Sequence, residues 1–232
     1  MRFEEPLVCA TLERRYKRFL ADMRLADGRR ITAHCPNPGS MIGLAQPGLR
    51  ALLSAADAAS ERRLRFTWEL VRVGRVWVCV NTMRANRVAR EALHAGRIRP
   101  LARQGVARPE VRVSRRSRLD FVLEGAGAGA YVEVKSVTMR RGSGALFPDA
   151  VTERGRRHLL ELARLARRGH RAVLLYLVMR NDCHWVGPAD AIDPAYGRTL
   201  RRVVAQGVEI LAYAVRVSPR GLDLGRRLPL RL

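Results

Sequence analysis

Short stretches in which apolar and polar residues alternate fill the first third of the chain. Alternation with a period of two is typical of strands that bury one face. Turn signals with glycine, such as Ala26-Asp27-Gly28, separate neighbouring stretches. We predict strands over residues 7–15, 19–25, 30–34, 49–55, 65–73 and 76–80. Strands this short and closely spaced fit a small barrel or sandwich, and an oligonucleotide-binding (OB) barrel is the more specific option.

The periodicity changes at Asn81, where helical patterns begin to alternate with strands. Asn81-Thr82 can cap a helix that runs through residue 95, and Gly96 is placed to end it. We predict strands at 110–114, 119–123, 131–137, 171–179 and 208–215, and further helices at 151–168 and 193–207. This order predicts an α/β domain with a mixed sheet flanked by helices. The boundary near residue 82 divides the chain into domains 1–82 and 83–232, and the fold class is α/β within the second domain and α+β overall.

Two predicted strands, 119–123 and 131–137, can pair as a hairpin with residues 124–129 as the loop. If paired residue numbers sum to 253, Leu119, Phe121 and Leu123 face Val134, Val132 and Ala130. The other face then places Asp120 opposite Glu133, and Arg118 opposite Lys135. One register therefore collects two carboxylates and a lysine, and a slip by one residue would mix the faces.

Lys135 is unusual in this composition. The chain has 44 Lys plus Arg, of which two are lysines, so 44 − 2 = 42 are arginines. A lysine kept in such a background is expected to do what arginine cannot, because its compact ammonium can exchange a proton. Asp120 and Glu133 repel each other unless a cation joins them, and Mg²⁺ or Mn²⁺ suits such oxygen ligands. Asp120, Glu133 and Lys135 thus match a metal-dependent phosphodiester-cleaving site; the alternative is an ordinary cross-strand ion pair on a surface hairpin.

The net charge of +23 points to a polyanionic partner, most simply nucleic acid. The preference for arginine over lysine in this chain does not explain the net charge, because exchanging lysine for arginine leaves the net charge unchanged. Residues 83–232 hold 30 bases and 13 acids (+17), against 14 and 8 (+6) in residues 1–82. No run approaches the length of a membrane span, and no signal-peptide core follows Met1, so we expect a cytoplasmic protein without a membrane partner. The scattered cysteines, without a Cys-x-x-Cys pair, do not favour zinc.

Other residues are weaker candidates for the same site. Arg154 and His158 lie four apart on one helical face, where His158 could act as a base or contact phosphate, or simply pack. Glu91 on the first helix of the second domain could complete a metal site, or could pair locally with a neighbouring arginine. In the first domain, basic residues alternate with aromatic residues, a pattern suited to binding a single nucleic-acid strand. A solvent-exposed edge of a β-strand would explain the same pattern equally well. The bases and the tyrosine of that segment are Arg14, Arg15, Tyr16, Lys17 and Arg18.

Six stretches of the chain are distinctive: Arg14–Asp22 (RRYKRFLAD), His34–Met41 (HCPNPGSM), Cys79–Thr82 (CVNT), Ser117–Phe121 (SRLDF), Val132–Thr138 (VEVKSVT) and Phe147–Gly155 (FPDAVTERG). Together they resemble the motifs of the bacterial and archaeal sugar fermentation stimulation protein A (SfsA) family. The resemblance covers nearly the whole chain and implies an OB-type barrel followed by a PD-(D/E)xK nuclease-like domain. It also implies non-specific DNA binding and a role in regulating sugar (maltose) metabolism, with the nuclease motif on Asp120, Glu133 and Lys135 and Glu91 as the helix acid. Pro38 departs from the family, which usually has Thr there.

The leading hypothesis is a DNA-binding two-domain protein with a divalent-metal, nuclease-type site that uses Mg²⁺ or Mn²⁺. One alternative is a binding-only regulator that keeps the fold without chemistry. Another is an RNA-binding module whose main surface is the barrel. The sequence leaves the oligomeric state open.

Overall fold

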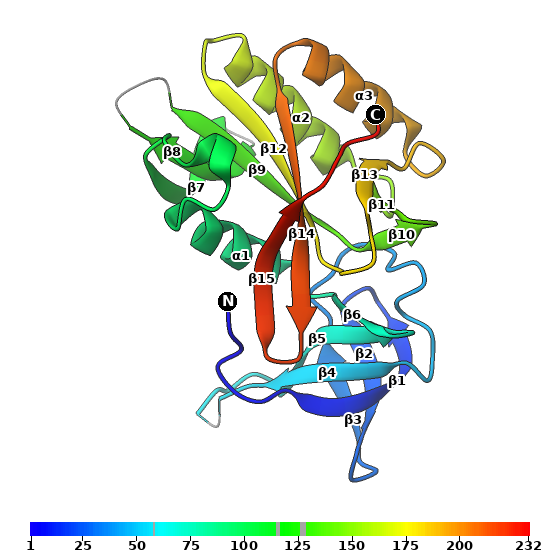
Figure 1. Ribbon diagram of the computed structural model, residues 1–232. Coiled ribbons are helices and arrows are strands. Elements are labelled where there is room, and N and C mark those ends of the chain that lie inside the picture. The colour runs from blue at the N-terminus through cyan, green and yellow to red at the C-terminus, as the bar shows by residue number, and fades with distance from the viewer. Residues whose placement is uncertain (58, 115–116, 126–128) are drawn as a thin grey trace.

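The computed structural model describes residues 1–57, 59–114, 117–125 and 129–232, so the middle of the predicted 124–129 loop lies outside the described residues. Two parts are visible in Figure 1: a small barrel at the bottom, and a larger layered domain above it. Among the described residues, no helix is long and apolar enough to cross a membrane.

The first part is a closed β-barrel, which confirms the predicted OB-type fold. Its sheet has the order β3-β2-β1-β4-β5-β6, and a parallel bridge between His34 of β3 and Thr67 of β5 closes it. Trp68, Leu12 and Met23 are fully buried in its core, which explains the alternating pattern of the sequence. The strands are β1 (Val8–Tyr16), β2 (Leu20–Leu25), β3 (Arg30–His34), β4 (Arg50–Ala55), β5 (Phe66–Val73) and β6 (Val76–Cys79).

The second part is a mixed six-stranded sheet with helices on both faces, as predicted. The strand order is β15-β14-β12-β9-β8-β7. The three central strands β14, β12 and β9 are parallel to one another, and the pairs β15–β14, β9–β8 and β8–β7 are antiparallel. Its strands are β7 (Val106–Ser114), β8 (Ser117–Glu124), β9 (Ala130–Val137), β12 (Arg171–Val178), β14 (Glu209–Ser218) and β15 (Gly221–Arg227). The short strands β10 (Met139–Arg141), β11 (Gly144–Phe147) and β13 (Trp185–Pro188) form a separate small sheet.

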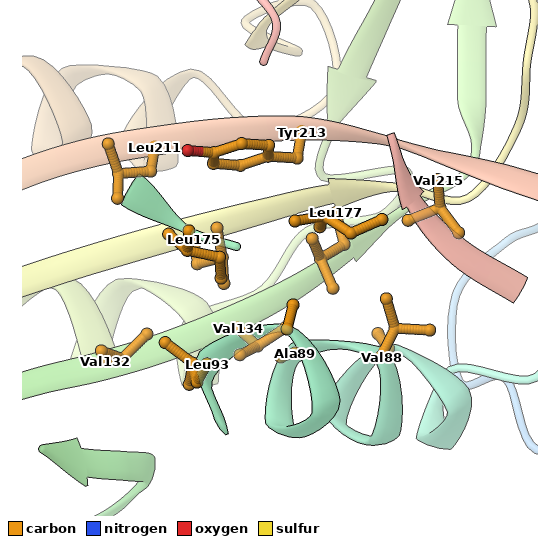
Figure 2. Packing of buried hydrophobic residues seen from close by; sticks show 14 of the residues in the cluster. Val88, Ala89, Leu93, Val132, Val134, Leu175, Leu177, Leu211, Tyr213 and Val215 are labelled. Carbon is orange, nitrogen blue, oxygen red and sulfur yellow. The ribbon is translucent and has the colours of Figure 1, made fainter. Parts of the chain in front are cut away.

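The helices cover the two faces of the large sheet. Helix α1 (Met83–His94) packs on the face of β9 that carries Val132 and Val134, and the same core continues to β14 (Figure 2). Helices α2 (Glu153–Ala166) and α3 (Pro194–Ala205) pack on the opposite face and bury a second core. A short 3₁₀ helix, η1 (Arg99–Leu101), follows α1.

The helix ends follow the predicted signals closely. Asn81 Oδ1 accepts the Met83 N–H at the start of α1, 3.1 Å away. Gly96 follows α1 with a φ of 63°, a conformation that suits glycine. The side chains of Thr152 and Asp193 cap α2 and α3 by accepting backbone N–H groups of the first turn.

Two sequence predictions about this domain were wrong in detail. Strand β7 begins at Val106 rather than at residue 110, and strands β10, β11, β13 and β15 were not expected. Leu119 was expected to share a face with Phe121, yet it packs in the core under α2 and α3 while Phe121 packs under α1. The β7–β8 ladder skips the pair between these two residues: Glu110, opposite Asp120, adopts a φ of 52° and is not paired with it.

A buried ion pair fastens the barrel to the second domain. Glu69 of β5 is completely buried, and its carboxylate accepts two hydrogen bonds from Arg84 of α1, at 2.6 and 2.9 Å. Asn81 and Ser54 donate to the same carboxylate at 3.0 and 2.8 Å. The two parts therefore meet through a fully hydrogen-bonded charge, and the apolar core under α1 extends into barrel residues such as Leu70.

Candidate functional site

Glu133, Lys135 and His158 form a close group between β9 and α2. Glu133 and Lys135 are two residues apart on one strand and therefore project from the same face. Lys135 Nζ lies 2.6 Å from Glu133 Oε1 and 3.4 Å from His158 Nδ1. His158 Nδ1 also contacts Glu133 Oε1 directly. The sequence predicted the pair on the strand and named His158 as a weaker candidate, and the structure brings His158 of α2 into contact with both.

Asp120 joins this group from the neighbouring strand by a different route from the predicted one. The β8–β9 ladder pairs Phe121, Val122 and Leu123 with Val132, Tyr131 and Ala130, so the predicted sum of 253 is confirmed for these pairs. The ladder ends there, and the expected Asp120–Glu133 and Arg118–Lys135 ladder pairs do not form.

Instead, the Asp120 carboxylate reaches the edge of β9 and accepts the Val134 N–H at 2.7 Å. Its other oxygen accepts a hydrogen bond from Asn86 of α1, also at 2.7 Å. Parting of the strands thus leaves a backbone donor open, and the aspartate uses it. Arg118 instead lies opposite Arg112 of β7.

Burial and charge shift the two carboxylates in opposite directions. Burial raises the pKa of Asp120, and the nearby charge of Glu133 raises it further. Burial also acts to raise the pKa of Glu133, but Lys135 and His158 together hold this pKa below its usual range. The charge of Glu133 is therefore stabilised by its neighbours, while Asp120 is the carboxylate that needs a further cation.

The donor set fits a hard divalent cation. Glu133 is 2 % exposed, yet its Oε2 atom has no hydrogen-bond partner among the described residues. A buried carboxylate oxygen without a partner is costly and calls for an explanation, such as an ion. The described residues contain no group of three or more His, Cys, Asp or Glu side chains arranged to hold a metal. Two carboxylates suit Mg²⁺ or Mn²⁺, which keep several waters and accept phosphate oxygens, and Asp120 with Glu133 would hold the ion.

A basic cleft opens beside this group. Arg154 and Arg157 of α2 line it together with Arg112 of β7 and Arg118 of β8, and His158 also lines it. The cleft has a volume of about 330 Å³. Guanidinium groups that converge on one cavity favour a phosphate-bearing ligand. We name this feature the arginine cleft.

Glu91 lies away from the candidate site. Its carboxylate binds the α-ammonium of Met1 at 2.7 Å and lies 3.7 Å from Arg87 on the same helix. Helix α1 offers Asn86 to Asp120 in its place. The prediction that Glu91 completes a metal site does not agree with this placement, because Glu91 and Asn86 flank opposite sides of the buried face of α1.

The barrel candidates divide into three groups. Arg14 and Tyr16 both bind Asp22, at 2.7 and 3.1 Å. Lys17 and Arg18 are exposed at the turn between β1 and β2. The third, Arg15, has a structural role that the sequence pattern did not indicate, because its guanidinium donates to backbone carbonyls of two loops.

Sequence reasoning missed Asn86, Arg112 and Arg157. Asn86 could have been found from the helical wheel, because it flanks the apolar stripe of α1 on the side that faces β8. Arg157 follows three residues after Arg154 and shares its side of α2. Arg112 had no signal of its own, since it depends on how far β7 extends.

The fold defines a two-domain protein in which an OB barrel precedes a mixed-sheet α/β domain, and the buried Glu133 of that domain lies beside the half-buried Asp120 and Lys135. The sequence models "SfsA N-terminal OB domain" and "Sugar fermentation stimulation protein RE domain" match residues 14–80 and 83–221. The chain therefore belongs to the sugar fermentation stimulation protein (SfsA) family.

Similar proteins support this assignment over the full length. Sugar fermentation stimulation protein homologs of Geotalea uraniireducens and Geobacter metallireducens are 50% and 52% identical, each covering 100% of both chains. A solved structure of Pyrococcus furiosus SfsA, described as a complex with Ca²⁺, covers 100% of this chain and 98% of its own, with a TM-score of 0.92 at 24% identity. At that identity the similarity shows the shared fold.

Proposed function

We propose that this protein binds DNA without sequence preference, and that its second domain hydrolyses phosphodiester bonds with Mg²⁺ or Mn²⁺. The unpartnered Oε2 atom of Glu133, buried beside Asp120 and next to the arginine cleft, is the observation that carries the proposal. The Ca²⁺ named for Pyrococcus furiosus SfsA is consistent with a divalent-cation site in this fold. When bound, the ion would polarise the phosphodiester and favour ionisation of an attacking water.

Each side chain of the group has a distinct task. Asp120 and Glu133 would hold the ion with their carboxylates. Lys135 keeps Glu133 ionised through a 2.6 Å ion pair and places an ammonium where negative charge develops on the phosphate. His158 fixes the orientation of Glu133 and faces the arginine cleft, where it can exchange a proton with water or substrate. In hydrolysis a water oxygen bonds to phosphorus, one P–O ester bond breaks, and the leaving oxygen is protonated.

DNA binding is supported by charge and shape. The net charge is +23, and the arginine cleft concentrates four guanidinium groups next to the acidic pair. Contacts to phosphates carry no sequence information, which agrees with binding that lacks sequence preference. A role in sugar (maltose) metabolism would then follow from DNA binding, in line with the name of the relatives.

The direct test is cleavage of plasmid and oligonucleotide DNA with Mg²⁺, Mn²⁺ or EDTA. Wild type should cut only with the metal, and Asp120→Asn and Glu133→Gln should lose cutting while binding DNA at least as well. Cutting that persists in both variants would overturn the nuclease assignment, because it would come from elsewhere or from a contaminant.

A binding-only protein is the second candidate, and the position of Glu91 favours it. With Glu91 bound to the Met1 ammonium, the described residues supply two carboxylates and no third acid. Wild type that binds DNA tightly but cuts neither DNA nor RNA with either metal would establish this function. Competition between DNA and structured RNA in the same assay decides whether the partner is RNA instead.

A further inference from the structure

A second cavity lies where the barrel meets the mixed-sheet domain. It has a volume of about 350 Å³. The turn between β1 and β2 and the loop at residues 36–40 form its barrel side, and the end of β9 and the loop before α2 form the other. Arg154 lines both this cavity and the arginine cleft, so the two are neighbours that share one residue. We name it the interdomain pocket.

The barrel side of the pocket is built by Arg15. Its Nη2 donates to the carbonyls of Asn37 and Gly39 at 2.8 and 2.9 Å, and its Nη1 donates to Ser40 O at 3.3 Å. Its Nε donates to Arg18 O at 3.0 Å. One side chain therefore fixes both the turn and the loop that line the pocket.

Asp149 connects the opposite wall to this loop. Its Oδ2 accepts the Met41 N–H at 2.9 Å, and its backbone carbonyl accepts the Ser40 hydroxyl. A side chain at Gly39 would have to displace the Asp149 carboxylate, so glycine at this position allows the close approach. The pocket is thus held from both domains by specific contacts.

Its lining combines flat apolar surface with a few polar groups. Phe147, Pro148 and Met139 supply apolar walls, and Arg18 and Arg154 carry positive charge at the exposed rim. Ser136 lines the pocket from β9, and its buried Oγ has no hydrogen-bond partner among the described residues. A buried hydroxyl without a partner marks a position where a ligand's polar atom would be accepted. The volume lies at the lower end of the range of about 300–1,000 Å³ for small-molecule sites.

We infer that the interdomain pocket takes one unpaired nucleotide of a DNA strand whose neighbouring phosphate occupies the arginine cleft. The base fits the apolar walls and the Ser136 hydroxyl, while Arg18 and Arg154 receive its phosphates. A base can enter only when it leaves its pair, so the preferred substrate contains an unpaired nucleotide rather than a continuous duplex. This inference rests on the proposed DNA function and names the substrate class of that site.

The test compares binding of two DNAs in EDTA, which prevents cutting: a continuous 20-base-pair duplex, and the same duplex with one unpaired nucleotide. Wild type should prefer the second by about tenfold, the scale of one base placed on an apolar or aromatic surface. Ala150→Phe, which adds a ring inside the pocket, should remove the preference and leave duplex affinity unchanged. Ser136→Ala should reduce the preference partly. Ala205→Phe, the same change at the exposed end of α3, should leave it intact.

The outcomes separate the two proposals. Wild type that binds both DNAs equally, or a preference that survives in Ala150→Phe, would overturn the pocket and leave non-specific DNA binding in place. A wild-type protein that binds neither of the two DNAs would overturn the proposed function itself. Free dAMP tests whether the pocket prefers a nucleotide outside a strand. It should compete only weakly, because it lacks the neighbouring phosphate, and strong displacement by dAMP would overturn the strand assignment.

Discussion

Asp120 Oδ2 accepts the backbone N–H of Val134 at 2.7 Å, at the point where β8 leaves β9. This hydrogen bond replaces the ladder contact that the two strands would otherwise make. It places the carboxylate between the residues Glu133 and Lys135 along the neighbouring strand, where the charge of Glu133 raises the Asp120 pKa. The parting of the strands is therefore part of the construction of the site.

Asp120→Asn should make the metal-free protein at least as stable as wild type at neutral pH. The folded-state pKa of Asp120 is raised, so the folded protein holds this proton more tightly than the unfolded chain, and ionisation above the folded pKa destabilises the fold. The cost is absent below the unfolded pKa of ~3.9, grows as pH rises from there to the raised folded-state pKa, and is constant above it. The asparagine oxygen can still accept the Val134 N–H, and its NH₂ group can donate to Asn86 once the Asn86 amide turns its oxygen inward. Urea unfolding of both proteins at several pH values should show curves that converge in acid and diverge with rising pH.

Added Mg²⁺ or Mn²⁺ should make wild type more stable than Asp120→Asn. Mg²⁺ or Mn²⁺ binding to the wild-type pair stabilises the fold by about 2.7 kcal/mol when the free ion is a hundredfold above its Kd, whereas Asp120→Asn lacks that ligand. Thermal melts with and without Mn²⁺ measure the difference. An equal metal-dependent rise in the Tm of the two proteins would show that the ion binds elsewhere.

Lys135→Arg should impair cleavage even though it keeps the positive charge. Lys135 Nζ contacts both Glu133 Oε1 and His158 Nδ1, and 14% of its side chain is exposed. The larger planar guanidinium of arginine cannot occupy the same place with the same contacts. We expect cleavage to fall by about two orders of magnitude or more, the scale of removing one electrostatic donor from a transition state. DNA affinity should change little. The chain offers a matched control in Lys17→Arg, its only other lysine, at an exposed turn of the barrel; comparable losses in both variants would contradict a special role for Lys135.

The arginine cleft should appear in the salt dependence of DNA binding. If Arg154 and Arg157 each neutralise one phosphate, replacing either with alanine should reduce the slope of log K against log salt by about 0.9. Arg201→Ala is the control, because Arg201 is on α3 and is paired with Asp190 at 2.6 Å. Fluorescence anisotropy at several salt concentrations gives the slopes. Equal slopes for Arg154→Ala and wild type would remove the cleft from the binding surface.

The sequence pattern predicted the strands and helices that bury a regular apolar face, and it predicted part of the β8–β9 register. It could not predict the end of that ladder, because the contacts made there by Asp120, with the Val134 N–H and with Asn86 of a distant helix, depend on the tertiary fold. For the same reason, the sequence could not predict which face of α1 is turned toward the site. Periodicity indicated a helix, while the choice between Asn86 and Glu91 depended on where the helix packs. The sequence identified Arg15 as a basic residue suited to nucleic-acid binding. Its contact with the 36–40 loop depends on the tertiary fold and could not be predicted.

The Glu69–Arg84 pair should be the strongest single polar link between the two domains. Glu69 is completely buried, so Arg84→Met leaves a charge without its main partner. The expected loss is about 2–3 kcal/mol, below the 3–5 kcal/mol typical of a broken buried pair, because Asn81 and Ser54 still donate to the carboxylate. Urea unfolding measures it.

Two further variants decide the cause of that loss. Glu69→Gln combined with Arg84→Met should recover much of the stability, since the double variant no longer buries an unpaired charge. Arg87→Met is the matched control on the same helix, because Arg87 pairs with the exposed Glu4 at 3.0 Å and such surface pairs contribute about 0–1 kcal/mol. If Arg84→Met costs no more than Arg87→Met, water must reach Glu69 in solution and the two domains must be held together mainly by the apolar core under α1.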